Sequence, residues 1–272
     1  MSIDELNPYQ ASAVDPKPPG PRGSMEYMQA VHYVFESPKW MANLLWGSLC
    51  ILTTQVIPIV GQLVWMGYQF EIVEDLLSRP PKTSYPDFDV NRLKEYLVRG
   101  LWILLVSLVL GLVFAPIMGG IAIAVVLAVL GTAAATGGDE AAMTVGVMIM
   151  MAIMIVVMMV LSVVATLVVT PVTIRAGLTQ DFRASFDFAW TKDFIRQMWL
   201  ETILSSLFII ALAMLAMCLG LLAFFVGVFP AMAAVILMQG HLYLQLYQLY
   251  LARGGHKIPL KPSGPIQPTT SV

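Results

Sequence analysis

The sequence predicts an all-α, polytopic integral membrane protein whose six transmembrane helices form three hairpins. Of the 272 residues, 58% are hydrophobic and only 12% are charged, which is about half the charged fraction of a typical soluble domain. The mean hydropathy is +0.78, and the stretch 145–169 carries no charged residue. Since about 20 apolar residues suffice to cross a bilayer, several stretches are long enough to do so.

The basic residues divide the chain into cytoplasmic and membrane parts. All 15 Lys and Arg fall in four clusters, within 17–39, 79–99, 175–196 and 253–261. Because Lys and Arg stay on the cytoplasmic side of membrane proteins, each intervening span should cross the membrane an even number of times. The spans are 40–78, 100–174 and 197–252. This arrangement predicts that both termini and the 78–96 loop are cytoplasmic.

Turn signals divide each span into two helices. The predicted helices lie at about 41–57, 59–77, 97–130, 143–174, 198–226 and 229–251. The last span turns near Gly227 and Pro230. The middle span breaks at GTAAATGGDEAAM (131–143), an expected outside loop in which Asp139 should cap the following helix by accepting from free backbone N–H groups.

The first span decides the topology, because it is too long for one crossing and short for two. As a single helix, 40–78 would be about 58 Å long, against a hydrocarbon core of about 30 Å. Pro58 removes a backbone donor, and Gly61 tolerates unusual dihedral angles. The segment TTQVIPIVGQ (53–62) is therefore predicted to form the outer turn of a short hairpin.

An alternative topology also gives six crossings. Residues 41–70 would form one kinked helix, 97–135 would break into two helices at APIMGG (115–120), and the 78–96 loop would lie outside. The basic cluster in this region disfavours the alternative, whereas six acidic residues between 71 and 95 weaken the contrast. The three-hairpin arrangement requires instead that 97–135 form one long helix, kinked near Pro116.

Outside the apolar stretches, the sequence predicts two tails and a set of interfacial helices. Residues 1–24 are proline-rich and 252–272 are basic; both are expected to be disordered, because neither can bury enough apolar surface. They flank a membrane domain at 25–251. Amphipathic segments with a Trp at the membrane entry (Trp46, Trp102 and Trp199) precede the three hairpins, which indicates helices in the headgroup plane. The shared pattern fits either a threefold repeat or a general property of membrane entry points.

Four segments carry a family resemblance. They are FESPKW (35–40), VIPIVGQLVWMGYQFEI (56–72), PDFDVNRLKEYLVRG (86–100) and TPVTIRAGLTQDFRASFDF (170–188). Over about residues 30–250 the chain resembles the uncharacterised prokaryotic multi-pass membrane proteins of domain-of-unknown-function family 4013. The resemblance implies a multi-pass protein of the cell (cytoplasmic) membrane of a prokaryote, and it implies no chemistry. The methionine-rich helix 143–174 departs from the Leu/Gly-rich composition expected there.

The sequence predicts no catalytic, cofactor-binding or metal-binding residues. It contains no H-E-x-x-H, no G-x-S-x-G and no glycine-rich phosphate loop, and His32, His241 and His256 each stand alone. The methionines of 143–174 could offer thioether ligands to Cu(I), but they spread around the helix. Adaptable packing is the better interpretation of these methionines, and no cofactor is expected.

Three polar residues are candidates for a role inside the membrane: Glu201, Gln239 and His241. An intramembrane ionisable group is a functional candidate by default. His241, however, has amide and hydroxyl neighbours along its helix, which favours a structural hydrogen bond. Glu201 lies near Arg196 and the cytoplasmic interface. At about 1.5 Å per residue, Glu201 and His241 lie at different depths, so no proton relay between them is expected.

These observations favour a non-enzymatic membrane scaffold or assembly protein. Its candidate contacts with anionic lipid headgroups are Arg92, Lys94, Arg99, Arg183, Lys192 and Arg196, at about 1 kcal/mol per contact. The expected partners are the lipid bilayer and another membrane protein; the net charge of −2 gives no reason to expect nucleic acid. The alternative is a transporter or channel-like protein for neutral or apolar cargo, because the predicted spans hold almost no charge.

Overall fold

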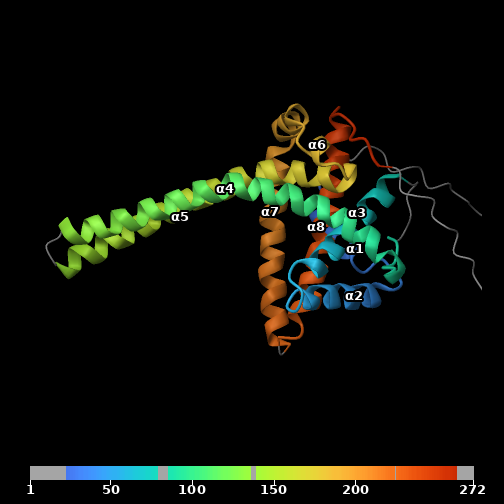
Figure 1. Ribbon diagram of the computed structural model, residues 1–272, viewed down its shortest axis with the longest axis horizontal. Helices are drawn as coiled ribbons and strands as arrows, with labels where there is room; N and C mark the ends of the chain where they lie inside the picture. The colour runs from blue at the N-terminus through green and yellow to red at the C-terminus, as the bar shows by residue number, and fades with distance from the viewer. Residues whose placement is uncertain (1–22, 79–84, 136–138, 224, 262–272) are drawn as a thin grey trace, which may run out of the picture.

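The computed structural model describes residues 23–78, 85–135, 139–223 and 225–261, and within them all regular structure is helical (Figure 1). The α-helices are α1 (Tyr27–Tyr33), α2 (Trp40–Thr53), α3 (Val60–Ser78), α4 (Leu93–Ala135), α5 (Glu140–Thr179), α6 (Phe182–Ser185), α7 (Phe188–Leu222) and α8 (Val228–Ala252). A 3-10 turn, η2 (Val90–Arg92), leads into α4.

The predicted helix breaks lie where the turn residues placed them. Residues 54–59 separate α2 from α3, and Ile59 at the end of this turn has a positive φ of 77°. Helix α4 runs without a break through Pro116. The alternative of one helix over 41–70 and a break at 115–120 is therefore wrong. Asp139 caps α5 as predicted, accepting from the backbone N–H of Ala141 and Ala142 at 3.0 and 3.3 Å.

In the described part of the chain, four helices are long and apolar enough to cross a membrane, whereas the sequence predicts six crossings. The four are α4, α5, α7 and α8. Helix α2 has 14 residues, so it is about 21 Å long and shorter than a hydrocarbon core of about 30 Å. Helix α3 is enclosed by protein over most of its length, from Gly61 to Glu74. The apolar run at 41–70 thus includes a central helix of the protein core.

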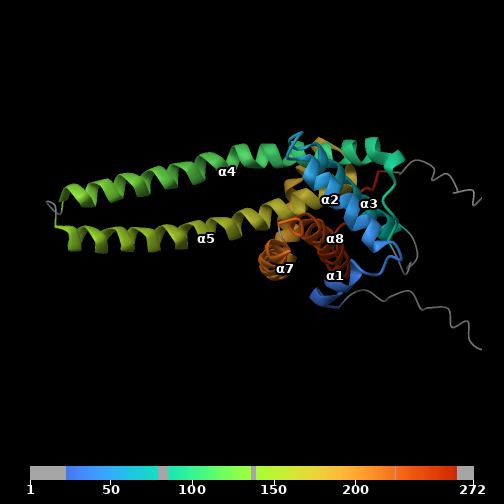
Figure 2. The same cartoon turned by 90° about the horizontal axis from the view of Figure 1, so that it is seen from below.

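The two long hairpins do not run parallel to one another. The α4–α5 hairpin extends away from the other helices in Figure 1, across the direction of α7; in Figure 2, α7 is seen nearly end-on while α4 and α5 run across the view. The most apolar stretches of α4 and α5 contain no buried residue. Lipid or another apolar surface must cover them, because exposing so much apolar area to water is unfavourable.

The compact part of the molecule is built around α3, which packs against α2, α4, α5 and α8. Its side chains join three clusters of buried apolar residues. Trp65 and Tyr68 belong to the first, Val73 to the second and Phe70 to the third. Helix α8 is the second central element, since most of its residues from Ala233 to Tyr250 are also buried.

Two segments expected as separate interfacial helices are the first turns of longer helices. Residues 93–104 begin α4, and most of 184–202 lies in α6 and α7. The sequence also predicts a disordered tail at 252–272, but the residues of this tail up to 261 pack on the protein. Ile258 is buried and its N–H donates to Tyr247 Oη at 2.7 Å. Residues 1–22 and 262–272 of the expected tails lie outside the described residues.

Two glycines permit the close packing of α3 on α4. A Cβ added at Gly67 would lie 1.9 Å from the backbone oxygen of Tyr96, and one at Gly100 would lie 2.0 Å from that of Leu63. Because the obstacle is backbone in both cases, a side chain at either position would force the helices apart. Small residues allow such close backbone approach in membrane proteins generally.

Gly67→Ala should therefore destabilise the protein by at least about 1–3 kcal/mol, measured by denaturant unfolding of the purified protein in detergent. Gly111→Ala is the matched control, because it makes the same change on α4 where no atom lies within 4 Å. That variant should be unchanged or more stable by up to about 1 kcal/mol. Equal stabilities of the two variants would contradict the packing argument.

Candidate functional site

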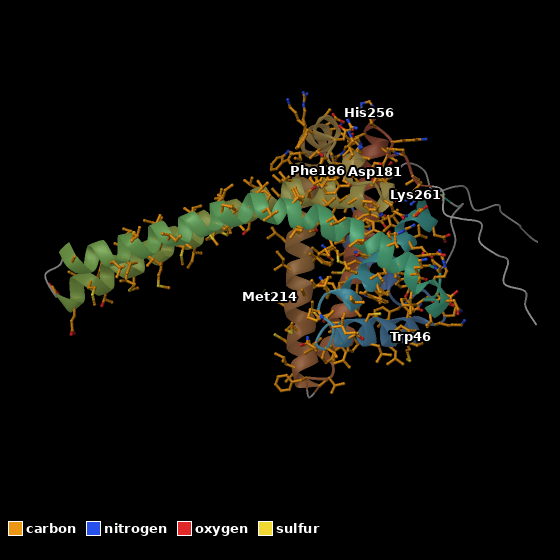
Figure 3. All side chains as sticks on the ribbon, in the orientation of Figure 1. Trp46, Asp181, Phe186, Met214, His256 and Lys261 are labelled. Atoms are coloured by element: carbon orange, nitrogen blue, oxygen red, sulfur yellow. The ribbon has the colours of Figure 1, made fainter. Side chains whose placement is uncertain are left out.

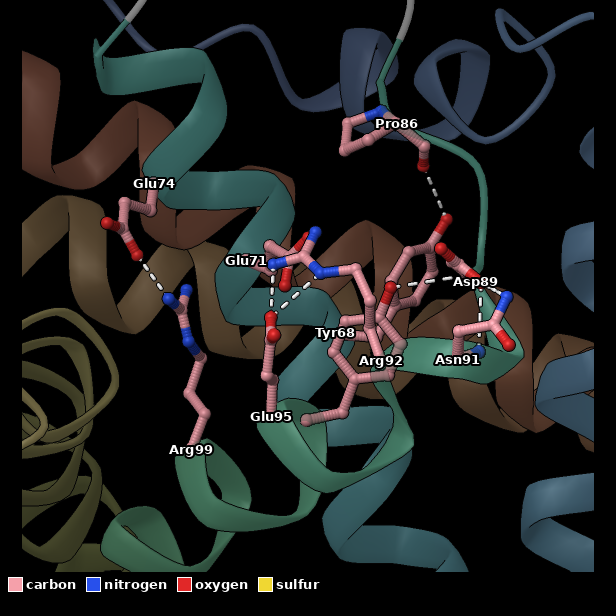
Figure 4. A network of polar contacts seen from close by, with 10 residues as sticks. Tyr68, Glu71, Glu74, Pro86, Asp89, Asn91, Arg92, Glu95 and Arg99 are labelled. Atoms are coloured by element: carbon pink, nitrogen blue, oxygen red, sulfur yellow. Dashed lines mark hydrogen bonds and ion pairs between the residues drawn. The ribbon is translucent and has the colours of Figure 1, made fainter. Parts of the chain in front are cut away.

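The largest concentration of buried charge lies where α3, the start of α4 and the end of α5 meet (Figure 4). We call this group the charged junction. Its members are Glu71, Glu74, Arg92, Glu95, Arg99 and Gln180. The acidic residues of the junction, Glu71 and Glu74, lie in α3, within a largely apolar part of the sequence. Their partners Arg92 and Arg99 lie in the basic segment that follows α3.

Arg99 is the centre of the charged junction. Its side chain is 7% exposed and forms an ion pair with Glu74, whose side chain is 4% exposed. The Gln180 amide, oriented so that its oxygen faces the guanidinium, accepts from Arg99 Nε at 3.1 Å and Nη2 at 2.8 Å. Gln180 ends α5 in a left-handed conformation with φ of 50°. Arg99 therefore ties three helices together through two contacts.

A second ion-paired group lies next to the first, where α3 faces the 3-10 turn η2 and the first turn of α4. Arg92 pairs with Glu71 and donates from Nη2 and Nε to Glu95 Oε2 at 2.6 and 2.8 Å. Burial raises the pKa of the Glu71 carboxyl above its ordinary value, and the positive charges of Arg92 and Arg99 only partly oppose this rise. The carboxylate of Glu71 thus depends on its arginine neighbours to remain charged away from water.

The segment before α4 is held in place by α3 and by the residues that immediately precede α2. Tyr68 Oη donates to the Pro86 carbonyl at 2.8 Å. Asp87 accepts from Ser37 Oγ at 3.1 Å and pairs with Lys39 Nζ at 3.1 Å. The FESPKW and PDFDVNR segments are therefore neighbours in space, and α3 lies beside both of them.

A separate buried arginine stabilises the corner between α5 and α7. Arg175 donates from Nε to the Ala184 carbonyl at 2.9 Å, pairs with Asp187 at 3.3 Å and stacks over the Trp190 ring at 5.0 Å. The segment that follows α8 packs on this corner, because Trp190 Nε1 donates to the His256 carbonyl at 2.8 Å. Figure 3 shows Asp181, His256 and Lys261 together at this end of the molecule, away from Met214 and Trp46.

This arrangement suits structural stabilisation better than proton transfer. General base catalysis requires a group of suitable pKa within hydrogen-bond reach of a substrate, whereas Glu71 and Glu74 face guanidinium groups inside the protein. Across the described residues, no group of three or more His, Cys, Asp or Glu could hold a metal ion.

The six residues predicted to contact lipid headgroups divide into two classes. Arg99 is buried and Arg92 is half-buried, and both are ion-paired within the charged junction. The other four are exposed, and none of them forms an ion pair with another described residue. These are Lys94, Arg183, Lys192 and Arg196. Burial leaves Arg99 almost no surface for a headgroup.

The three candidate intramembrane residues have different partners. Glu201, which is close to Arg196 in sequence, pairs with Arg253 at the end of α8. His241 Nδ1 lies 3.0 Å from Gln245 Nε2, and its ring stacks on Tyr33 at 4.4 Å. Gln239 Nε2 donates to Tyr243 Oη at 2.7 Å. His241 thus has a hydrogen-bonding neighbour on its own helix, and a structural role for it stays a prediction.

Sequence reasoning missed the charged junction because it used these charges only as topology signals. One signal was present: Glu71 and Glu74 lie three residues apart, and Arg92 and Arg99 lie seven apart. Both spacings place each pair on one face of a helix. Acidic residues within an apolar run, followed by arginines with matching spacing, indicate a pair of packed helices with complementary charges.

Replacing Arg99 should show how strongly the charged junction stabilises the fold. Arg99→Met leaves the Glu74 carboxylate buried without its guanidinium, and should lower the free energy of unfolding by about 3–5 kcal/mol. Lys94→Met, the same change at an exposed site on the same helix, should cost less than about 0.5 kcal/mol. The double variant Glu74→Met/Arg99→Met should recover much of the loss. Equal costs for Arg99→Met and Lys94→Met would refute a structural role for Arg99.

The comparisons with known proteins identify the family of the chain. The family model described as "Protein of unknown function (DUF4013)" matches residues 50–238, which is more than half of the chain. The match includes three of the four resembling segments, whereas FESPKW lies before it. No curated protein and no solved structure matches the chain. The chain therefore belongs to the DUF4013 family of proteins of unknown function.

Proposed function

We propose that this protein is a non-catalytic scaffold of a prokaryotic cell membrane that docks anionic lipid, and another membrane protein, at its cytoplasmic face. One observation carries the proposal. The arginines of the charged junction form ion pairs inside the protein. In contrast, four basic residues are exposed and form no ion pair with any described residue: Lys94, Arg183, Lys192 and Arg196. Unpaired cations beside membrane-spanning helices are suited to lipid phosphates.

The α4–α5 hairpin supports the scaffold part of the proposal. Side chains such as Leu112, Leu127, Met148 and Ile155 are more than half exposed. Helix α4, with 43 residues, would be about 64 Å long. That length exceeds what a bilayer requires, and a helix adapts to such an excess by tilting or kinking, or by thickening the bilayer around it. The rest of the chain covers little of the α4–α5 hairpin, so its apolar surface is free to contact lipid and the helices of a partner protein.

A transporter of neutral or apolar cargo is the second candidate function. It is favoured by a pocket between α5, α7 and α8 whose lining includes hydroxyl and amide groups. The scaffold is preferred because the charged groups are engaged in ion pairs or lie on the surface, and a pathway for polar cargo usually contains intramembrane ionisable groups.

In the proposed orientation, both chain ends and the segment before α4 face the cytoplasm. A single cysteine at Val90, which is 42% exposed, in a variant with Cys50→Ala and Cys218→Ala should not react with a membrane-impermeant thiol reagent in intact cells. It should react after lysis. Glu140→Cys in the same background is the control and should react without lysis, because it lies in the expected outside loop. Labelling of the residue-90 cysteine in intact cells would reverse the orientation.

Neutralising the four unpaired cations tests the lipid contact. The variant Lys94→Gln/Arg183→Gln/Lys192→Gln/Arg196→Gln should retain less phosphatidylglycerol in native mass spectrometry, since each lost contact contributes about 1 kcal/mol. Phosphatidylcholine retention and membrane insertion should be unchanged. Glu140→Gln, an exposed charge change at the far end of α5, should have no effect. Unchanged phosphatidylglycerol retention in the quadruple variant would show that these cations act only in topology.

A further inference from the structure

A pocket of about 300 Å³ lies where α5 passes α7 and α8. Its walls are mainly apolar, but each of the three helices contributes hydrogen-bonding side chains. These are Thr166 and Thr170 from α5, Ser205 and Ser206 from α7, and Gln239 and Tyr243 from α8. Polar groups within membrane-spanning helices are costly unless they find partners, so this concentration marks the pocket as a candidate binding site.

Two of these groups are arranged to recognise a hydroxyl. Gln239 Nε2 donates to Tyr243 Oη at 2.7 Å, which leaves the Gln239 amide oxygen as an acceptor and the Tyr243 O–H as a donor. The Tyr243 ring stacks on Phe70 of α3 with centroids 5.9 Å apart, so α3 holds it in position. A hydroxyl group both donates and accepts, and it could satisfy both groups at once.

The charge of the lining restricts the ligand further. None of the described residues that line the pocket is Asp, Glu, Lys, Arg or His. A charged headgroup placed here would lose its hydration without gaining a counter-charge, which is strongly unfavourable. The ligand headgroup must therefore be neutral, and a phosphate or ammonium headgroup is excluded.

The surroundings of the pocket indicate that the ligand comes from the membrane. Ile210 at its edge is 54% exposed, and Leu207 and Val164 on the flanking helices are 56% and 46% exposed. These apolar side chains belong to two of the membrane-spanning helices. The volume is at the lower end of the range for ligand pockets, which accommodates a headgroup and the start of a chain while the remaining chain lies in lipid.

We propose that the α5–α7–α8 pocket binds a neutral amphiphile through a free hydroxyl group. Tyr243 Oη donates a hydrogen bond to the hydroxyl oxygen, and Gln239 Oε1 accepts a hydrogen bond from the hydroxyl O–H. Diacylglycerols and long-chain polyprenols share this chemistry. The site does not depend on the scaffold function, because it uses none of the exposed cations. If the pocket binds no alcohol, the proposal that exposed cations dock anionic lipid is unaffected. If the cations dock no lipid, the proposal for the pocket is likewise unaffected.

The test measures retention of four probes by the purified full-length chain in native mass spectrometry. The probes are a dioleoylglycerol, its acetate ester, a long-chain polyprenol and its acetate ester. We expect the wild type to retain at least one free alcohol more strongly than its ester, because the ester has no O–H to donate to Gln239. Which alcohol is retained identifies the source of the ligand.

Tyr243→Phe and Gln239→Leu should each reduce retention of the free alcohol about three- to tenfold, the effect of one neutral hydrogen bond, and leave ester retention unchanged. Tyr243→Phe keeps the ring on Phe70, so the fold should persist. Gln248→Leu makes the same change as Gln239→Leu on α8 outside the pocket and should have no effect on retention. Equal retention of alcohol and ester, or wild-type retention in both pocket variants, would overturn the proposal.

Discussion

The contact between α3 and α4 is the constraint on which the other helices depend. Gly67 and Gly100 let the two backbones approach so closely that a Cβ at either position would overlap a carbonyl oxygen of the facing helix. The same approach brings Arg99 to Glu74, and Gln180 adds the end of α5. Because a buried charge without its partner is strongly unfavourable, the ion pair of Arg99 with Glu74 favours this register of α3 and α4.

Because of this contact, charged side chains are buried while many apolar side chains are exposed. Charged groups lie inside the compact part, whereas α4, α5 and α7 carry large apolar side chains on their surfaces. In water such an arrangement would be unstable, but in a bilayer the apolar surface is solvated by lipid and buried polar groups must be satisfied internally. The compact part can thus hold the ends of two long apolar hairpins, α4–α5 and α7–α8, which run in different directions.

Basic residues have two roles in this protein that composition cannot separate. Arg99 and Arg175 are buried among partners and hold helices together, whereas residues such as Lys192 and Arg196 are exposed. Both classes satisfy the charge rule for cytoplasmic segments, so both look like topology signals. Only the exposed class can meet lipid phosphates or a partner, and the neutral pocket beside Tyr243 offers a chemically different surface.

The sequence by itself determined the helical membrane class, the turn at Pro58 and the cap of α5 at Asp139, because these depend on apolar length, missing donors and caps within a few residues. Only the tertiary structure decided that α3 is enclosed by the other helices, that Arg99 pairs with Glu74, and that residues up to 261 pack on the protein. The physical reason is that burial and charge pairing join residues far apart in the chain. Glu74 and Arg99 meet only because two glycine-containing helix faces bring their backbones together, and no local pattern encodes that distance.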